Sequence, residues 1–212
     1  MTAPVLVIDT AGPWCACALD AGGAIRLRAQ DIGRGHAEAL APWVAALLYE
    51  AGCAPRDLSR IGVNVGPGGF AGVRVGVAFA RGLALASGAR AVGVGALDAW
   101  ALQADPDRVG DVFCVHDARR GELIWRLFRK GVPLNDFQRG GLDAARAALS
   151  AEPGARLAGS GAALLGGPVF DHEPPIQALL SLTRAAPADA PSPAPVYARA
   201  PDAKLAGGAY LA

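Results

Sequence analysis

The pattern of apolar and polar positions near the amino terminus predicts three short strands. Residues 5–9 are an apolar run that ends at Asp9, and residues 14–19 and 24–28 read as two further runs of the same kind. A turn at residues 20–23 joins the second and third runs. We expect these strands to form an antiparallel meander at the edge of a sheet.

The next seventy residues alternate between helical and strand-like periodicity. The predicted elements are a helix over 36–51, a strand over 61–65, a glycine-rich turn over 66–72, a helix over 73–87, a strand over 91–94 and a short helix over 97–103. This βαβ order implies parallel strands joined by a right-handed crossover.

A boundary between two lobes is expected at residues 105–107, where Asp-Pro-Asp interrupts the pattern. The predicted lobes are residues 1–104 and a smaller unit of residues 105–212. In the second lobe we expect strands over 112–116, 123–129 and 156–158, a helix over 142–149, and an extended, unpacked tail from Pro187 to Pro201. This element order predicts an α/β protein of the actin/Hsp70/sugar-kinase type (the ASKHA fold), with mixed sheets flanked by helices and a reduced second lobe.

Composition excludes several classes of protein. Hydrophobic residues make up 52% of the 212 residues, so a sizeable core can form, and 20 basic against 19 acidic side chains argue against an independent nucleic-acid binder. The four cysteines form no CxxC pair, and we expect reduced, mostly buried thiols. No basic leader and no stretch apolar and long enough to cross a membrane is recognised, so the cytoplasm is the expected location.

The glycine-rich turn is a candidate nucleotide site. Asp9, Gly68 and Gly69 could face a phosphate, because the turn follows a strand and opens a helix. Pro67 removes one amide donor, and no acidic residue ends the strand over 91–94 to meet a ribose. A tight turn of small residues is the alternative for the glycines, and a side-chain cap of the adjacent turn is the alternative for Asp9.

Metal-binding and nucleophilic patterns are incomplete. His36, His116 and His172 are far apart in sequence, and the prolines after His172-Glu173 prevent an HExxH helix. Ser160 lies in a sequence that is not GxSxG, and His116-Asp117 has no recognisable nucleophile beside it. We therefore expect no catalytic residue, no metal site and no cofactor.

The two long predicted helices are apolar over more than half of their circumference, which packing on a single sheet does not require. We interpret part of that surface as a binding face for another protein, with packing onto the sheet as the alternative. The predicted partner-binding residues are His36, Leu40, Trp43, Val44, Leu47, Val73, Val77, Ala80, Arg81 and Ala84.

Several linked motifs resemble one known family, TsaB (YeaZ). They are Val7-Ile8-Asp9-Thr10-Ala11, Arg34-Gly35-His36-Ala37-Glu38, the segment from Gly66 to Arg74, the segment from Val115 to Glu122, and Pro195-Val196-Tyr197-Ala198-Arg199. The resemblance implies an actin-like fold and a heterodimer with TsaD, the related protein that transfers threonylcarbamoyl to adenosine in tRNA. It also implies that the two helices form the heterodimer interface and that TsaE is contacted through the assembly. We expect tRNA to be contacted only indirectly, and the sequence leaves open whether the chain alone is a homodimer or a monomer.

The resemblance also explains the missing chemistry. TsaD carries an HxxxH metal pair, and alignment of Gly93-Val94 with that motif places Ala96 and Trp100 at the two histidine positions. Asn64, Val65 and Ala71 depart from the family pattern at the glycine-rich turn. Our first hypothesis is a non-catalytic, activating subunit in threonylcarbamoyladenosine synthesis. The alternative is a small ATP-dependent phosphotransferase that uses Asp9 and the glycine-rich turn.

Overall fold

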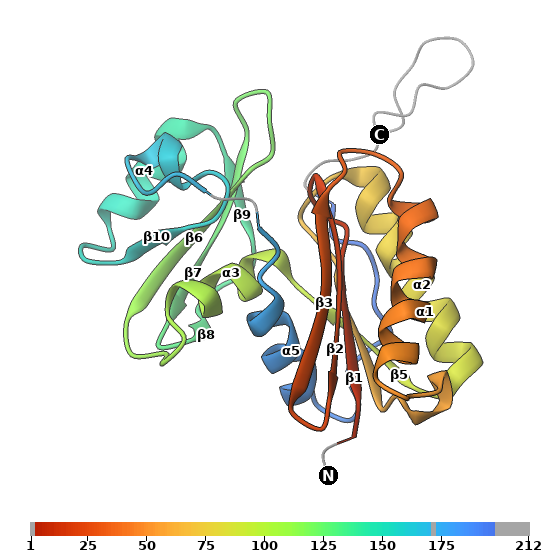
Figure 1. Cartoon of the computed structure of the whole chain (residues 1–212). Coiled ribbons are helices and arrows are strands. Elements are labelled where there is room, and N and C mark those ends of the chain that lie inside the picture. The colour runs from red at the N-terminus through yellow and green to blue at the C-terminus, as the bar shows by residue number, and fades with distance from the viewer. Residues whose placement is uncertain (1–2, 171–172, 198–212) are drawn as a thin grey trace.

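Two sheets form the framework of the chain in a computed structural model that describes residues 3–170 and 173–197 (Figure 1). The first sheet has five strands in the order β3-β2-β1-β4-β5. The strands are β1 Val5–Asp9, β2 Trp14–Ala21, β3 Ala24–Asp31, β4 Arg60–Asn64 and β5 Arg90–Val94. The predicted meander is confirmed, since β1 and β2, and β2 and β3, pair antiparallel, while β1–β4 and β4–β5 pair parallel.

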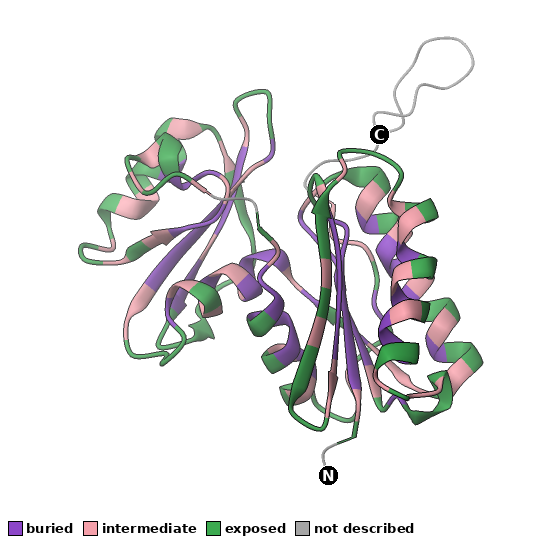
Figure 2. Cartoon of the chain, in the orientation of Figure 1, coloured by how far each residue is buried: buried purple, intermediate pink, exposed green. Residues whose placement is uncertain are grey.

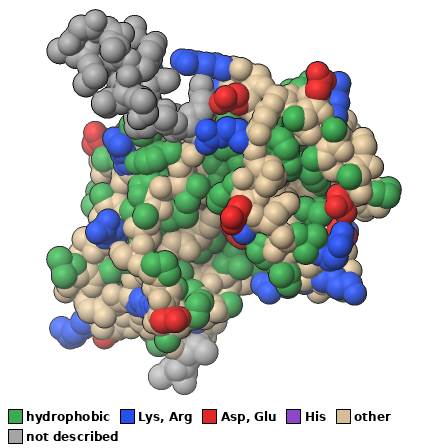
Figure 3. Space-filling model, turned by 180° about the vertical axis from the view of Figure 1, so that it is seen from behind, with side chains coloured by type: hydrophobic (Ala, Val, Ile, Leu, Met, Phe, Trp, Pro, Cys, Tyr) green, Lys and Arg blue, Asp and Glu red, His purple; other side chains and the backbone are tan. Residues whose placement is uncertain are grey.

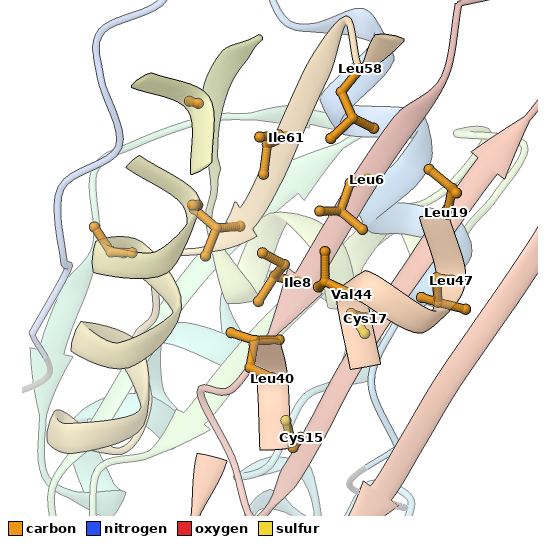
Figure 4. Packing of buried hydrophobic residues seen from close by; sticks show 14 of the residues in the cluster. Leu6, Ile8, Cys15, Cys17, Leu19, Leu40, Val44, Leu47, Leu58 and Ile61 are labelled. Atoms are coloured by element: carbon orange, nitrogen blue, oxygen red, sulfur yellow. The ribbon is translucent and has the colours of Figure 1, made fainter. Parts of the chain in front are cut away.

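One face of this sheet is covered by α1 (His36–Glu50) and α2 (Phe70–Ser87) (Figure 1). Strand β1 is buried along its whole length, and alternate residues such as Leu6 and Ile8 point toward these helices. Figure 4 shows Leu40, Val44 and Leu47 of α1 directed into that core. The strand-helix order predicted from the sequence is therefore correct for this part of the chain.

The opposite face of the first sheet is covered by α5 (Ile176–Ala185), a helix that the sequence analysis did not predict. Leu179 and Leu180 of α5 pack in one cluster with Val5 and Val7 of β1. In α5, residues 176, 179, 180 and 183 are all buried. This spacing of three and four residues is typical of one helix face and could have been recognised in the sequence.

The single boundary predicted at residues 104 and 105 therefore needs correction. Helix α3 (Ala96–Ala104) packs partly on the second sheet through Leu97 and Ala101, although it precedes the boundary. Helix α5 follows the boundary but completes the first lobe. The chain leaves the first lobe once and returns to it, as Figure 1 shows.

The second sheet joins β6, β7, β8 and β10 in the order β10-β6-β7-β8, and β9 pairs with β7. Its elements are β6 Asp111–Asp117, β7 Leu123–Arg129, β8 Val132–Pro133, β9 Gln138–Gly140, α4 Leu142–Ser150 and β10 Arg156–Ala158, and two short 3₁₀ helices lie at Pro55–Asp57 and Ala162–Leu165. The predicted strands and helix of this lobe are confirmed, whereas β8 and β9 are too short to have given a sequence signal.

Residues 187–197 run along β5, the edge strand of the first sheet. Pro193 is buried against Gly93, and the Val196 amide donates a hydrogen bond of 2.7 Å to the Val65 carbonyl. The Arg90 guanidinium donates to the Ala188 and Ala190 carbonyls. The predicted extended conformation is correct for these residues, but the segment is packed and shields an exposed edge. Residues 198–201 of the predicted tail lie outside the described part.

Helix α2 corrects the expectation that no stretch of the chain is long and apolar enough to cross a membrane. Its 18 residues have a mean hydropathy of 1.3, which by length and composition is enough to cross a membrane. Arg74 and Arg81 are its only charged residues, and the remainder are mostly alanine, glycine, valine and leucine. In this structure α2 packs one side on the first sheet, and its other side is exposed (Figure 2).

Candidate functional site

A cleft of about 610 Å³ lies between the two lobes. The first lobe contributes Asp9, Asn64 and the glycine-rich turn, and the second lobe contributes His116 and Ser160. Residues far apart in the sequence thus share one cavity, because both sheets present the carboxyl ends of their strands β1, β4 and β6 to it.

Asp9 is held by two hydrogen bonds at the end of β1. Its Oδ1 accepts from the Ala11 amide at 2.9 Å and its Oδ2 accepts from Asn64 Nδ2 at 2.9 Å. Burial raises the pKa of Asp9 above its usual value. The hydrogen bonds from Asn64 and Ala11 and the nearby His36 lower the pKa, but burial is the largest effect. Asp9 therefore caps the adjacent turn, which was the alternative to a phosphate-binding role.

Asn64 has a role that the sequence analysis did not recognise. While its amide nitrogen donates to Asp9, its Oδ1 accepts from the Gly66 amide at 2.9 Å. The side chain thereby joins the ends of two parallel strands and fixes the start of the glycine-rich turn.

The glycines of this turn are used for close packing. The Gly69 amide donates to the Ala11 carbonyl at 2.7 Å, so this donor is already satisfied. A Cβ on Gly68 would lie 2.5 Å from the Ala11 carbonyl oxygen, and one on Gly72 would lie 2.0 Å from that of Thr10. The Thr10 hydroxyl in turn donates to the Gly72 carbonyl at 2.8 Å. The turn docks α2 against β1, which was the alternative stated for Gly68 and Gly69.

On the opposite wall the fold brings His116 and Ser160 together across 44 residues of sequence, a pairing that sequence analysis missed. His116 Nδ1 lies 2.9 Å from Ser160 Oγ, which also accepts from the Asp117 amide at 3.1 Å. A hydroxyl oxygen can accept two hydrogen bonds and donate one, so the donor in this contact is the Ser160 hydroxyl or the Nδ1–H of His116, according to the tautomer of the imidazole.

This pair is a weak base. Burial lowers the pKa of His116 to about 4, with Asp117 raising it and Arg119 lowering it further. The Asp117 carboxylate accepts from the Arg119 amide at 2.8 Å and from its Nη1 at 3.3 Å, so it does not orient the imidazole. A serine nucleophile needs a base of higher pKa held by a third group. We therefore assign His116 and Ser160 a structural contact.

Aromatic side chains line much of the remaining cleft, namely Trp14, Phe70, Trp100, Phe170 and Tyr197. Their arrangement is ordered: the Phe70 and Tyr197 rings are 4.9 Å apart, and Trp100 and Phe170 meet edge to face at 4.8 Å. Trp100 stands at one of the positions where the resemblance places a TsaD histidine, and here its indole lines the cleft.

Metal ligands do not gather in the described part of the chain, where no group of three His, Cys, Asp or Glu side chains occurs. His172 lies outside the described residues. All four cysteines are free thiols, with Cys15, Cys17 and Cys114 buried and Cys53 half-buried. Burial raises the pKa of Cys15 to about 11 and that of Cys17 to about 12. The expectation of reduced, mostly buried thiols agrees with this arrangement.

Most of the predicted partner-binding residues are wrong as surface residues. Seven of them lie in the core of the first lobe, between the helices and the sheet: Leu40, Val44, Leu47, Val73, Val77, Ala80 and Ala84. Figure 4 labels three of these, Leu40, Val44 and Leu47. Trp43 and His36 are half-buried, and His36 Nε2 lies 3.2 Å from the Trp14 carbonyl oxygen. Arg81 alone of the ten is exposed. The side of each helix with the larger apolar residues faces the sheet, because burying them there removes the most apolar surface from water.

A different apolar surface of the same helices is exposed. We call it the helix face and define it by Ala37, Ala41, Ala45 and Tyr49 of α1 with Ala78, Gly82, Leu85 and Ala86 of α2. Tyr49 is 88% exposed and Leu85 is 89% exposed. Figure 2 shows exposed positions, interspersed with half-buried ones, on the side of α1 and α2 that points away from the sheet. Large apolar side chains on a surface of small residues are typical of a protein-binding face.

Positive charge forms no continuous surface in the view from behind. Lys and Arg side chains lie apart over most of that side, and several lie near one another at its lower right, close to acidic side chains (Figure 3). This distribution agrees with the balanced composition and differs from the continuous basic surface of an independent tRNA-binding protein.

Comparisons with known proteins agree with the fold and its motifs. Residues 29–161, more than half of the chain, match the family described as "TsaD: tRNA N6-adenosine threonylcarbamoyltransferase". The "tRNA threonylcarbamoyladenosine biosynthesis protein TsaB" of Escherichia coli is 32% identical over 127 residues, 59% of this chain and 55% of that protein. The solved structure "YeaZ from Pseudomonas aeruginosa" aligns with a TM-score of 0.70 at 25% identity over 87% of this chain and 93% of that one. The chain belongs to the TsaB (YeaZ) family.

The similarity extends along nearly the full length of the chain in one further relative. A Mycobacterium tuberculosis protein is 37% identical over 212 residues, covering 94% of this chain and 93% of that protein. Together with the observed strand order, the likeness to YeaZ confirms the predicted actin/Hsp70-like fold of this TsaB-family chain.

Proposed function

We propose that this TsaB-family chain is a non-catalytic subunit of the complex that synthesises threonylcarbamoyladenosine on tRNA. The names of its Escherichia coli and Bacillus subtilis relatives, both "tRNA threonylcarbamoyladenosine biosynthesis protein TsaB", support a part in that biosynthesis. In this proposal the chain binds TsaD as a heterodimer, contacts TsaE through the assembly, reaches tRNA only indirectly and works in the cytoplasm.

The helix face is the observation that supports a binding role. Tyr49 and Leu85 are large apolar side chains with nearly full exposure, and the other residues of the helix face are alanine and glycine. The exposed Arg81 lies one turn before Leu85, and the exposed Glu50 follows Tyr49. Small residues let a second helix approach closely, so a partner's helices can pack between α1 and α2. Burial of such a surface against TsaD removes apolar area from water, which is the main favourable contribution to association.

The cleft supports the non-catalytic part of the proposal. Its buried carboxylate, Asp9, is engaged in two hydrogen bonds, and its imidazole, His116, is a weak base. Among the described residues that line the cleft, Arg119 is the one Lys or Arg side chain, whereas phosphoryl transfer needs several positive groups or metal ions around the phosphates. These features disfavour the alternative of a small ATP-dependent phosphotransferase.

The test replaces one exposed apolar residue on each lobe. Leu85→Glu introduces a charge on the helix face near the C-terminal end of α2, and Val169→Glu introduces one at an 87% exposed position of the second lobe. We expect Leu85→Glu to weaken heterodimer formation with the cognate TsaD by at least about tenfold, because a charge is desolvated in the interface, and Val169→Glu to leave it unchanged. Analytical ultracentrifugation of the mixed proteins measures the affinity.

Both positions are exposed, so the folded chain tolerates the substitutions, in contrast to charges at the buried Leu40 or Val77. An unchanged affinity of Leu85→Glu together with Tyr49→Glu contradicts the proposed face. Tight binding of Mg-ATP by the isolated chain, followed by turnover in calorimetry, contradicts the non-catalytic role and favours the phosphotransferase.

A further inference from the structure

The cleft between the lobes is not used by the proposed subunit role, yet it has the properties of a small-molecule site. Its volume of about 610 Å³ lies within the range of ligand pockets, roughly 300–1,000 Å³. Five aromatic side chains line it in a chain in which aromatic residues make up 6%. These are five of the 13 Trp, Tyr and Phe residues of the chain, and they give the cleft flat, apolar walls.

The charges around the cleft favour a cation. Asp9, Asp117 and Glu173 are the acidic side chains in its lining, and Arg119 is the one described Lys or Arg side chain there. The Arg119 side chain is 76% exposed and forms an ion pair with Asp117. Its positive charge therefore offsets the negative charge at the rim of the cleft more than that in the interior. A cavity with an excess of carboxylates repels phosphate and concentrates positively charged molecules.

The margin of the cleft already binds a guanidinium on aromatic rings. The Arg74 guanidinium carbon lies 3.7 Å from the centre of the Phe70 ring and 5.4 Å from that of Tyr197, and Arg74 Nε donates to the Tyr197 hydroxyl at 2.7 Å. On the other wall Trp100 and Phe170 meet at 70°, which makes a corner of two ring surfaces. Indole is the ring that attracts cations most strongly.

From this combination we propose that the cleft binds a small organic cation, an alkylammonium or guanidinium compound. The cationic group lies against Trp100 and the ring corner with Phe170, and the carboxylates supply the compensating charge. The apolar part of the ligand lies toward Trp14. No covalent step is involved, and the proposal is independent of the helix face.

The first experiment compares choline with 3,3-dimethylbutan-1-ol, in which carbon replaces the quaternary nitrogen. The two have nearly the same shape, so the comparison isolates the charge. We expect calorimetry on the whole chain to give an affinity for choline at least about tenfold higher than for the alcohol. Equal affinities, no binding of either compound, or binding of ATP in preference to choline overturns the proposal.

The location is tested by the indole N–H signals in nitrogen-edited NMR spectra. Choline is expected to shift the signals of Trp14 and Trp100, which line the cleft, and to leave those of Trp43 on α1 and Trp125 in the second core unchanged. Shifts confined to Trp43 or Trp125 place the ligand elsewhere and contradict the proposed site.

Matched variants test the role of charge within the protein. Glu173→Gln removes a carboxylate from the cleft lining, and Glu152→Gln removes one that pairs with Arg129 away from the cleft. The first is expected to weaken choline binding about threefold or more, and the second to leave it unchanged. Equal effects of the two substitutions contradict a local role of the cleft carboxylates, and this comparison does not depend on replacing the packed Trp100.

Discussion

Single residues in this chain show how burial decides the chemistry of a side chain. Asp9 could be recognised from the sequence as a polar residue at a strand end, but its partner Asn64 could not. Likewise, no sequence pattern connects His116 with Ser160, because the contact depends on how the loop after β10 lies beside β6. The identity of candidate residues was thus accessible from the sequence, whereas the hydrogen bonds that limit their reactivity required the structure.

The cysteines give a prediction at this scale. Cys15, Cys17 and Cys114 are buried, and burial raises the pKa of each thiol, so we expect them to be unreactive in the native protein. Cys53 is half-buried and accessible to reagent. Titration with a disulfide reagent should modify one thiol in the native chain and all four in denaturant. The Cys53→Ser variant is the control, and rapid native modification of that variant contradicts the expectation.

His116 makes stability depend on pH. Its pKa falls from 6.5 to about 4 on folding because burial disfavours the imidazolium, so the unfolded chain binds a proton more readily. The contribution of the neutral, buried His116 to the free energy of unfolding is fully present above pH 6.5 and is lost as the pH falls from 6.5 toward 4. Between pH 7 and pH 5 we expect the free energy of unfolding to fall by up to about 2 kcal/mol more in the native chain than in His116→Gln.

Urea unfolding of both proteins at the two pH values measures this difference. The comparison with His116→Gln cancels the contribution of the carboxylates, which titrate in both proteins. If the two proteins lose the same free energy between pH 7 and pH 5, His116 is not buried in its neutral form.

At the scale of elements, the two long helices show what hydrophobic periodicity can and cannot decide. Periodicity placed α1 and α2 correctly but did not distinguish the side that faces the sheet from the side that faces solvent. Gly76 lies on the side of α2 that faces the sheet. A Cβ at this position would lie 2.5 Å from the Thr10 hydroxyl oxygen, so the helix approaches the sheet closely there. Both sides of α2 are apolar, so only the position of the sheet separates core residues from the helix face.

The contact of α5 with β4 buries a hydroxyl group, that of Thr183, which a substitution can remove. Thr183 is fully buried over Gly62, and its Oγ1 finds no hydrogen-bond partner in the described part of the chain. Thr183→Val keeps the shape and removes the hydroxyl, so we expect the free energy of unfolding to rise by about 1 kcal/mol. Thr183→Ala is the control for lost packing and should lower stability. Chemical denaturation of the three proteins measures both changes, and a loss of stability in Thr183→Val indicates that the hydroxyl is bonded.

At the scale of the whole molecule, the two lobes are not two consecutive segments. The sequence contained the signals for both sheets and for the break at residues 105–107, because these depend on local patterns. It did not show that α5 returns to the first sheet, since that depends on packing between residues about 170 positions apart, such as Leu179 and Val5. The Arg184–Asp20 ion pair of 2.7 Å joins the same two parts of the chain.

This return predicts which lobe responds when α5 is weakened. Leu179 is fully buried among β1 and β5 residues, so Leu179→Ala should lower the stability of the first lobe by about 2–5 kcal/mol. Leu127→Ala, at a buried position of β7, is the matched control in the second lobe. Native-state hydrogen exchange reports each lobe separately through the amides of β1 and β4 or of β6 and β7. We expect Leu179→Ala to reduce protection in β1 and β4 more than in β6 and β7, and Leu127→Ala to do the reverse. The opposite pattern for Leu179→Ala means that α5 is stabilised mainly by the second lobe, and α5 is then not a part of the first lobe.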